Sequence, residues 1–116
     1  MRETASLFKA LGDKTRLQMI WLLFHQKELC VCDFMEVLGV TQSKASRHLR
    51  SLYHAGLVTD RREGTWSYYT LLPSDDELVA THMEALRQSL VTRPELGETL
   101  EQLERWLSRK ERGESA

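Results

Sequence analysis

A change of hydrophobic period at Gly56 constrains the fold of this chain more than any other feature. Up to that glycine, apolar residues recur at helical spacing. Residues 57–71 (LVTDRREGTWSYYTL) are instead rich in β-branched and aromatic side chains around Arg-Glu-Gly, which predicts a β-hairpin. A chain of 116 residues has room for one modest core. We therefore expect a mostly α-helical protein that carries a small hairpin.

Capping residues and glycine turns divide the sequence before the hairpin into helices. The four predicted helices are residues 4–11, a segment capped by Asp13, a segment from Cys32 or Asp33 to Leu38, and a segment from Thr41 to Gly56. Gly39 is expected to take the sharp turn between the last two. Two short helices joined in this way predict a helix-turn-helix.

Two further helices are predicted after the hairpin. Asp75 or Asp76 can cap the first of them. Residues 92–95 (TRPE) have the pattern of a capping box with proline in the first turn of the second. The expected architecture is a winged helix-turn-helix of order α-α-α-α-β-β-α plus an extra C-terminal helix. We assign residues 1–91 to DNA binding and dimerisation, and residues 92–116 to the additional helix and a frayed tail.

Basic charge is concentrated in the first part of the chain. Through Leu72 there are 10 Lys and Arg against 7 Asp and Glu, a balance of +3, and from Pro73 onward 6 against 10, a balance of −4. Such a block predicts contact with a polyanion, here double-stranded operator DNA. The second helix of the helix-turn-helix would enter the major groove, and the hairpin tip would contact the backbone or minor groove. The candidate DNA-binding residues are Thr41, Gln42, Ser43, Lys44, Ser46, Arg47, His48 and Arg50 of the helix, and Arg61 and Arg62 of the hairpin.

Two questions about these surfaces stay open in the sequence. The ring of His48 has two possible positions, at a DNA phosphate or against the hairpin. A single unit makes few DNA contacts, so we expect a homodimer that reads two half-sites. Its interface would use apolar side chains of the terminal helices, which are otherwise part of the core of one chain. These side chains are Leu7, Phe8, Leu11, Leu78, Met83, Leu86 and Leu90.

The only two cysteines, Cys30 and Cys32, lie one residue apart just before the helix-turn-helix. The sequence shows neither a signal peptide nor a membrane-spanning run, so we expect a cytoplasmic protein with reduced thiols and no membrane contact. Thiolates bind soft metals, and a helix N-terminus lowers the pKa of a cysteine. Residues i and i+2 of a helix are rotated by about 200°. A ligand held by both sulfurs would therefore reshape the first turn. Buried, unreactive thiols are the alternative.

The stretch from Glu28 to Leu71 (ELCVCDFMEVLGVTQSKASRHLRSLYHAGLVTDRREGTWSYYTL) closely resembles the ArsR/SmtB family of bacterial winged-helix repressors, and ELCVCD resembles the metal-sensing box of its arsenical-responsive members. The resemblance covers roughly Ala5 to Leu72. It implies a homodimer that binds its operator and leaves when trivalent arsenic or antimony binds Cys30 and Cys32. The familiar box has another cysteine where this chain has Met35. Organoarsenicals, which need only two thiols, are thus a further candidate inducer.

Other functions are weaker candidates. A repressor of the same fold that senses oxidants, or cadmium, zinc or lead, would also use a dithiol. A dithiol metallochaperone would not need a basic helix shaped for a groove. The sequence contains no glycine-rich phosphate loop, nucleophile elbow or HExxH motif, so we do not expect an enzyme.

Overall fold

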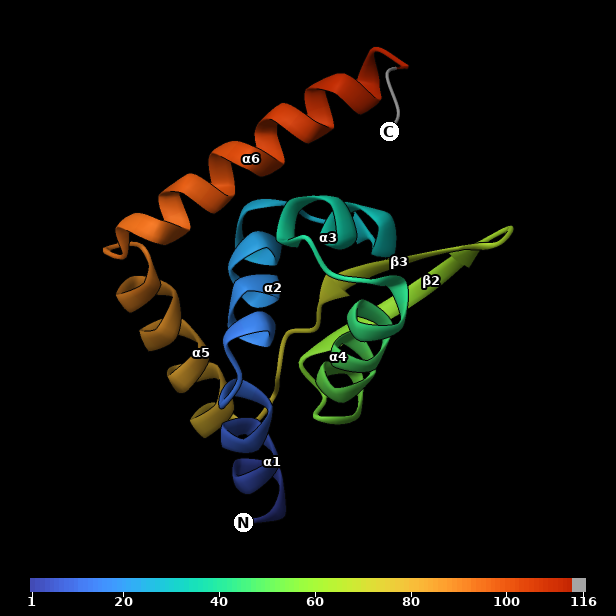
Figure 1. The fold of residues 1–116 in the computed structure, drawn as a ribbon. Coiled ribbons are helices and arrows are strands. Elements are labelled where there is room, and N and C mark those ends of the chain that lie inside the picture. Colours follow the sequence, from blue (N-terminus) through green and yellow to red (C-terminus); the bar gives the residue numbers. More distant parts are fainter. Residues whose placement is uncertain (114–116) are drawn as a thin grey trace.

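The computed structural model describes residues 1–113 and has the predicted order of helices around a hairpin. Figure 1 shows the helices surrounding α2, with the hairpin projecting to one side. The elements are α1 (Arg2–Leu11), α2 (Lys14–His25), β1 (Leu29–Cys30), α3 (Val31–Leu38), α4 (Gln42–His54), β2 (Val58–Glu63), β3 (Trp66–Leu71), α5 (Glu77–Leu90) and α6 (Pro94–Glu111). The mostly helical winged helix-turn-helix is therefore confirmed. None of the helices within residues 1–113 is long and apolar enough to span a lipid bilayer.

The sheet contains one strand more than the sequence predicts. Its antiparallel order is β1-β3-β2, so β1 pairs with β3, the second strand of the hairpin. Leu29 lies opposite Tyr69, and Cys30 lies opposite Tyr68. A strand of two residues is too short to show a period in the sequence. The first cysteine is thus part of the sheet that carries the wing.

The core forms where α2 meets α3, α4 and α6. Met19, Ile20 and Leu22 of α2 are fully buried, as is Phe34 of α3. Burying a side chain of this size stabilises the fold by about 1.5–3 kcal/mol. Because α2 is apolar on several sides, it can serve as the central helix against which the others pack.

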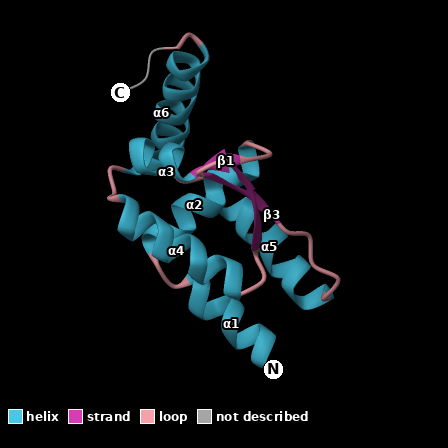
Figure 2. Ribbon diagram, turned by 90° about the vertical axis from the view of Figure 1, so that its right-hand side faces the viewer, coloured by secondary structure: helices cyan, strands magenta, loops and turns pink. Residues whose placement is uncertain are grey.

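Helix α6 belongs to the same core as the winged helix. It crosses α2 and α3 at one end of the molecule, with α1 at the opposite end (Figure 2). Leu103 of α6 is 0% exposed. The indole Nε1 of Trp21 donates a hydrogen bond of 2.9 Å to the carbonyl oxygen of Leu96. The last helix is therefore packed against the fold rather than attached to its surface by a linker.

Several boundaries differ from the predictions, beginning with α1, which starts at Arg2 rather than at residue 4. Helix α3 begins at Val31 with Cys30 as its N-cap, because the Asp33 carboxylate accepts the N–H of Cys30. The predicted capping box at residues 92–95 is wrong, since Arg93 is the N-cap of α6 and the Thr92 hydroxyl donates to the Ser89 carbonyl. The predicted frayed tail includes Glu111, which is helical, and residues 114–116, which lie outside the described residues.

We predict that Leu103→Ala lowers the free energy of unfolding by about 2–5 kcal/mol, because it removes a buried side chain and leaves a cavity where α6 packs on the core. Urea unfolding followed by circular dichroism measures this. Glu101→Ala, on the exposed face of the same helix, is the control and should change stability by no more than about 0.5 kcal/mol. Equal effects of the two substitutions would contradict the shared core.

Candidate DNA-reading surface and dithiol site

Helix α4 presents a polar face that is suited to a DNA groove. Thr41 caps it by accepting the N–H of Lys44 at 3.1 Å. Its apolar side, which includes Ala45 and Leu49, is buried against the core. Most of the predicted contact residues lie on the opposite side. Thr41, Gln42, Ser43, Lys44, Arg47 and Arg50 are exposed, and Ser46 and His48 are half-buried.

His48 does not take one of the two positions expected for it, the one against the hairpin. Its contact with a DNA phosphate stays a prediction. Arg16 donates a hydrogen bond of 3.0 Å from Nη1 to His48 Nδ1, and Asp13 Oδ1 lies 4.0 Å from the same nitrogen. The ring therefore packs against the start of α2. Burial lowers the pKa of His48, although the nearby Asp13 carboxylate acts in the opposite direction. A neutral His48 is suited to holding α4 on α2.

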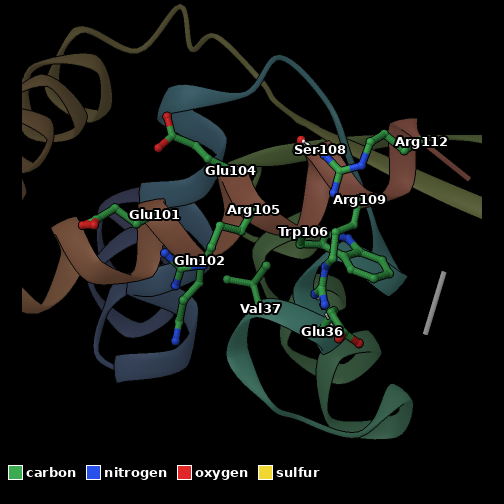
Figure 3. Close-up of a pocket in the computed structure, with 10 residues that line it drawn as sticks. All are labelled: Glu36, Val37, Glu101, Gln102, Glu104, Arg105, Trp106, Ser108, Arg109 and Arg112. Atoms are coloured by element: carbon green, nitrogen blue, oxygen red, sulfur yellow. Dashed lines mark hydrogen bonds and ion pairs between the residues drawn. The ribbon is translucent and has the colours of Figure 1, made fainter. Parts of the chain in front are cut away.

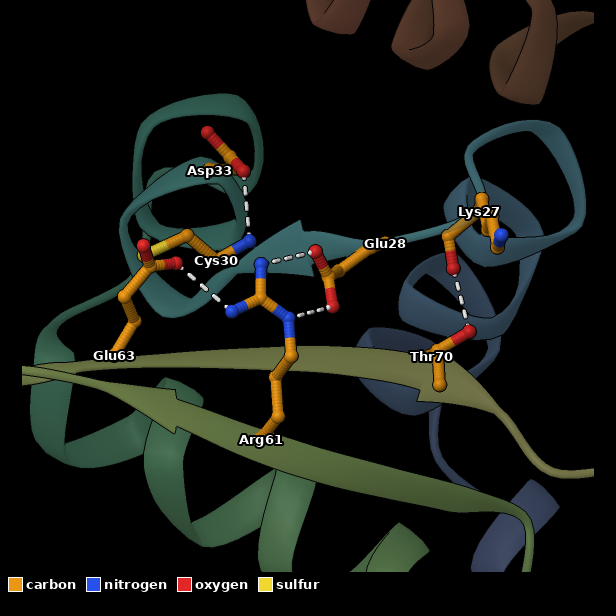
Figure 4. Close-up of polar contacts among 7 residues, drawn as sticks. All are labelled: Lys27, Glu28, Cys30, Asp33, Arg61, Glu63 and Thr70. Carbon is orange, nitrogen blue, oxygen red and sulfur yellow. Dashed lines mark hydrogen bonds and ion pairs between the residues drawn. The ribbon is translucent and has the colours of Figure 1, made fainter.

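The two arginines of the wing have different surroundings. Arg61 donates to both carboxylate oxygens of Glu28, at 2.7 and 2.8 Å, and to Glu63 at 2.8 Å (Figure 4). Its guanidinium also lies over the ring of Tyr68, 4.6 Å from the centroid. Two carboxylates thus offset the charge of Arg61. Arg62, the next residue of β2, faces the other side of the strand, toward α4.

The two thiols lie at the junction of β1 and α3. Cys30 is 1% exposed and has an extended backbone, with φ −80° and ψ 156°. Cys32 lies in the first turn of α3 and is partly exposed, and both thiols are free. The expectation of a 200° rotation inside one helix is therefore wrong for this pair, because Cys30 precedes the helix. A ligand held by both sulfurs does not by itself require the first turn to unwind.

The protonation of Cys32 also differs from the expectation. Burial raises the pKa of Cys32 to about 12, and the adjoining Cys30 thiol and the negative charge of Asp33 act in the same direction. Lys110 opposes this rise. Desolvation and a neighbouring carboxylate thus outweigh the helix dipole, which favours the thiolate. The raised pKa favours the neutral thiol over the thiolate at Cys32.

A buried carboxylate connects the dithiol to α6. Asp33, 2% exposed, accepts the N–H of Cys30 at 2.8 Å, Nε1 of Trp106 at 2.8 Å and Nζ of Lys110 at 2.7 Å. The ammonium of Lys110 also lies 3.8 Å from the sulfur of Cys32. Sequence reasoning missed Trp106 and Lys110 as partners of Asp33, because they lie 73 and 77 residues away from it. An acid inside an apolar helical segment was the one available signal.

A cavity of about 490 Å³ adjoins Cys32. Its walls come from α3, α4 and the hairpin. The residues that line it include Cys32, Met35, Gln42, Ser46, Arg50, Asp60, Arg62, Trp66 and Tyr69. The exposed thiol and several of the predicted DNA-contact residues therefore face one space.

A second, more open hollow lies between α3 and α6. Its volume is about 740 Å³, and charged side chains line most of it (Figure 3). Glu36 of α3 and Arg109 of α6 form an ion pair across it, with 3.8 Å between Oε1 and Nη2. Because acids and bases alternate along its walls, this groove offers no single charge to a ligand. We treat it as a surface cleft between two packed helices.

The predicted dimer residues divide into two groups. Leu7 and Leu90 are buried in the core of their own chain. Phe8 and Leu78 are 51% and 43% exposed, and Leu11, Met83 and Leu86 are partly buried. Phe8 also packs edge-on against His82, with 5.1 Å between the ring centroids. Among the predicted dimer residues, Phe8 and Leu78 are therefore the ones that leave most of their apolar surface uncovered.

No three or more His, Cys, Asp or Glu side chains within residues 1–113 are grouped so as to hold a metal ion. The dithiol therefore offers two sulfurs without a third such ligand from the described part of the chain. Met35 lines the adjoining cavity, and its thioether is a weaker donor than a thiolate.

A helix-turn-helix followed by a basic hairpin on a helical core defines a winged helix-turn-helix regulator that binds DNA. Residues 13–60 match the model of the bacterial regulatory proteins of the arsR family. The arsenical resistance operon repressor of Bacillus subtilis is 45% identical over 78 residues, which are 67% of this chain and 72% of the relative. This chain belongs to the ArsR family and is a transcriptional repressor rather than an enzyme.

Two further relatives extend the comparison. A cadmium resistance regulator (CadC homolog) of Staphylococcus aureus is 40% identical over 82 residues, 71% of this chain and 65% of that protein. A solved structure from Mycobacterium bovis, described as a homodimeric winged helix-turn-helix DNA-binding domain of a possible ArsR-family regulator, has a TM-score of 0.65 and 31% identity. That match covers 80% of this chain and 82% of the other.

We predict that Cys32 reacts slowly with iodoacetamide. At a pH near the ordinary cysteine value of about 8.5, its raised pKa should leave alkylation at least about tenfold slower in the folded protein than in urea. Mass spectrometry of a Cys30→Ser variant isolates the reaction of Cys32. Equal rates in the two states would show that the thiol is not held in its neutral form.

Proposed function

We propose that this protein is a homodimeric repressor that binds operator DNA and leaves it when trivalent arsenic or antimony binds Cys30 and Cys32. The observation that carries the proposal is the position of the dithiol, at the start of α3 and on the wall of a cavity shared with α4 and the wing. Its DNA contacts would be made by the exposed face of α4 and by Arg62, with Arg61 in a supporting role. Phe8 and Leu78 would contribute most to the dimer.

Contacts around Cys30 offer a route from the dithiol to the wing. The strand that contains Cys30 pairs with β3, and the Glu28 carboxylate is bound to Arg61. The hydroxyl of Thr70 donates to the carbonyl of Lys27, as Figure 4 shows. A ligand that moves Cys30 therefore pulls on the hairpin. A coupling of about 1–3 kcal/mol, or about 5–150-fold in DNA affinity, suffices for a switch.

The dithiol is suited to a neutral arsenical. Arsenous acid condenses with two thiols, so that two As–S bonds form, two As–O bonds break, and each thiol proton leaves with a hydroxyl as water. This reaction needs no thiolate in the resting state, and the raised pKa of Cys32 favours the neutral thiol there. Because Cys30 is buried, we infer that the ligand enters at Cys32 and that the β1–α3 junction opens locally. An aryl substituent of an organoarsenical could occupy the adjoining cavity beside Trp66 and Tyr69.

Thiol chemistry also bears on two alternative signals, an oxidant and a cadmium ion. Oxidant sensing depends on a thiolate of lowered pKa, whereas the pKa of Cys32 is raised. Cadmium is the second candidate inducer, because a cadmium resistance regulator is among the relatives and thiolates bind soft ions. A divalent ion must displace the thiol protons into solvent, so its affinity should increase with pH. The affinity for arsenite, which binds by condensation, should depend much less on pH.

We predict specific binding to an imperfect inverted repeat upstream of the protein's own gene, and loss of that binding on addition of arsenite. A mobility-shift assay with arsenite, phenylarsine oxide, cadmium, zinc and peroxide as separate additions tests the inducer. Cys30→Ser and Cys32→Ser should bind the operator as the wild type does but ignore arsenite. A normal response of both variants would make the dithiol structural only, and absence of any shifted band would end the proposal.

Arg47 of α4 and Arg62 of the wing should have separable roles in DNA binding. Arg47→Ala should relax discrimination between operator and mismatched sites, by about 1–3 kcal/mol per contacted base pair. Arg62→Ala should weaken binding to all sequences alike and make the salt dependence shallower by about one phosphate contact. Affinities measured over a salt series on specific and random DNA distinguish the two. Identical behaviour of the variants would contradict this division.

A further inference from the structure

We propose that Lys110 of α6 completes the dithiol site by donating a hydrogen bond to the oxygen that arsenite retains after two thiols have bound it. This inference rests on the proposed function. It assigns to the last helix, which lies beyond the family match of residues 13–60, a part in choosing the inducer. The chemical class that it favours is a trivalent arsenical or antimonial that keeps a hydroxyl when held by two sulfurs.

The position of Lys110 supports this role. Its ammonium is 3.8 Å from the sulfur of Cys32 and 2.7 Å from Oδ1 of Asp33. Asp33 holds the amine in place, and the lysine side chain is 37% exposed, so a ligand can reach it. An ammonium has three N–H donors, which allows it to serve the carboxylate and a ligand oxygen together. Lys110 is thus a cation held within hydrogen-bonding range of the partly exposed thiol.

The composition of the site leaves a place for such a donor. Arsenous acid that has condensed with two thiols still carries one hydroxyl on arsenic. Phenylarsonous acid loses both of its hydroxyls in the same reaction and keeps only a carbon substituent. A third thiol would remove the hydroxyl of arsenite as well, but the corresponding position in this chain is Met35. A hydrogen-bond donor beside the dithiol therefore stabilises the arsenite complex and not the phenyl complex.

The test compares the two arsenicals on the full-length protein without DNA. Arsenite and phenylarsonous acid are titrated into the wild type and Lys110→Met, with tryptophan fluorescence as the readout, because Trp106 shares the Asp33 carboxylate. Loss of one charge-assisted hydrogen bond should weaken arsenite binding about tenfold. Binding of phenylarsonous acid should stay unchanged. Lys110→Arg, which keeps a cationic donor, should retain most of the arsenite affinity.

Arg105→Met is the matched control, because it removes an exposed cation from the same helix, on the wall of the cleft between α3 and α6. It should alter neither affinity. An equal loss of affinity for both arsenicals in Lys110→Met would overturn the inference, since it would show that Lys110 only positions the dithiol. Unchanged affinity for both would overturn it as well. If that variant does not fold, the ratio of the two affinities is measured in Lys110→Gln, whose neutral amide can still donate to Asp33. Its hydrogen bond to the ligand is no longer charge-assisted, so the preference for arsenite should fall, and an unchanged ratio would overturn the inference. Wild-type protein that binds neither arsenical would remove the proposed function itself.

Discussion

The geometry of the dithiol site depends on one buried carboxylate. An ionised group away from water is strongly unfavourable unless hydrogen bonds satisfy it. Asp33 meets this condition with donors from the strand before α3 and from two side chains of α6. The same three bonds fix the N-terminus of α3, the backbone at Cys30 and the angle at which α6 crosses the core. The thiols are therefore held in position by the last helix as well as by their own.

The helices and the hairpin could be predicted from the sequence because local signals specify them. Asp13, Thr41 and Asp76 accept hydrogen bonds from the first turns of their helices, as their positions indicated. Gly39 has φ 65°, which explains the sharp turn before α4. The polar face of α4 likewise follows from the spacing of its apolar residues. Each of these features is decided within a few residues along the chain.

The interactions that assemble the site were not predictable in the same way. Arg16 and His48 are 32 residues apart, and Asp33 and Lys110 are 77 apart, so no local pattern joins them. The wing arginines are adjacent and chemically identical, yet the sheet places Arg61 beside Glu28 and turns Arg62 toward α4. The pKa of Cys32 also depends on burial and on Asp33 more than on the helix dipole that the sequence suggests. Tertiary contacts, rather than residue type, decide these properties.

The cavity beside Cys32 has a consequence for how proteins of this design diversify. Gln42, Arg50 and Arg62 line it, and the same side chains belong to the surface that we propose contacts DNA. A substitution that adapts one of them to a new operator also reshapes the chamber next to the thiol. One substitution would then change both the preferred operator sequence and the response to the inducer. Divergence after gene duplication should proceed most freely where the two surfaces do not overlap, at Ser43 and Arg47.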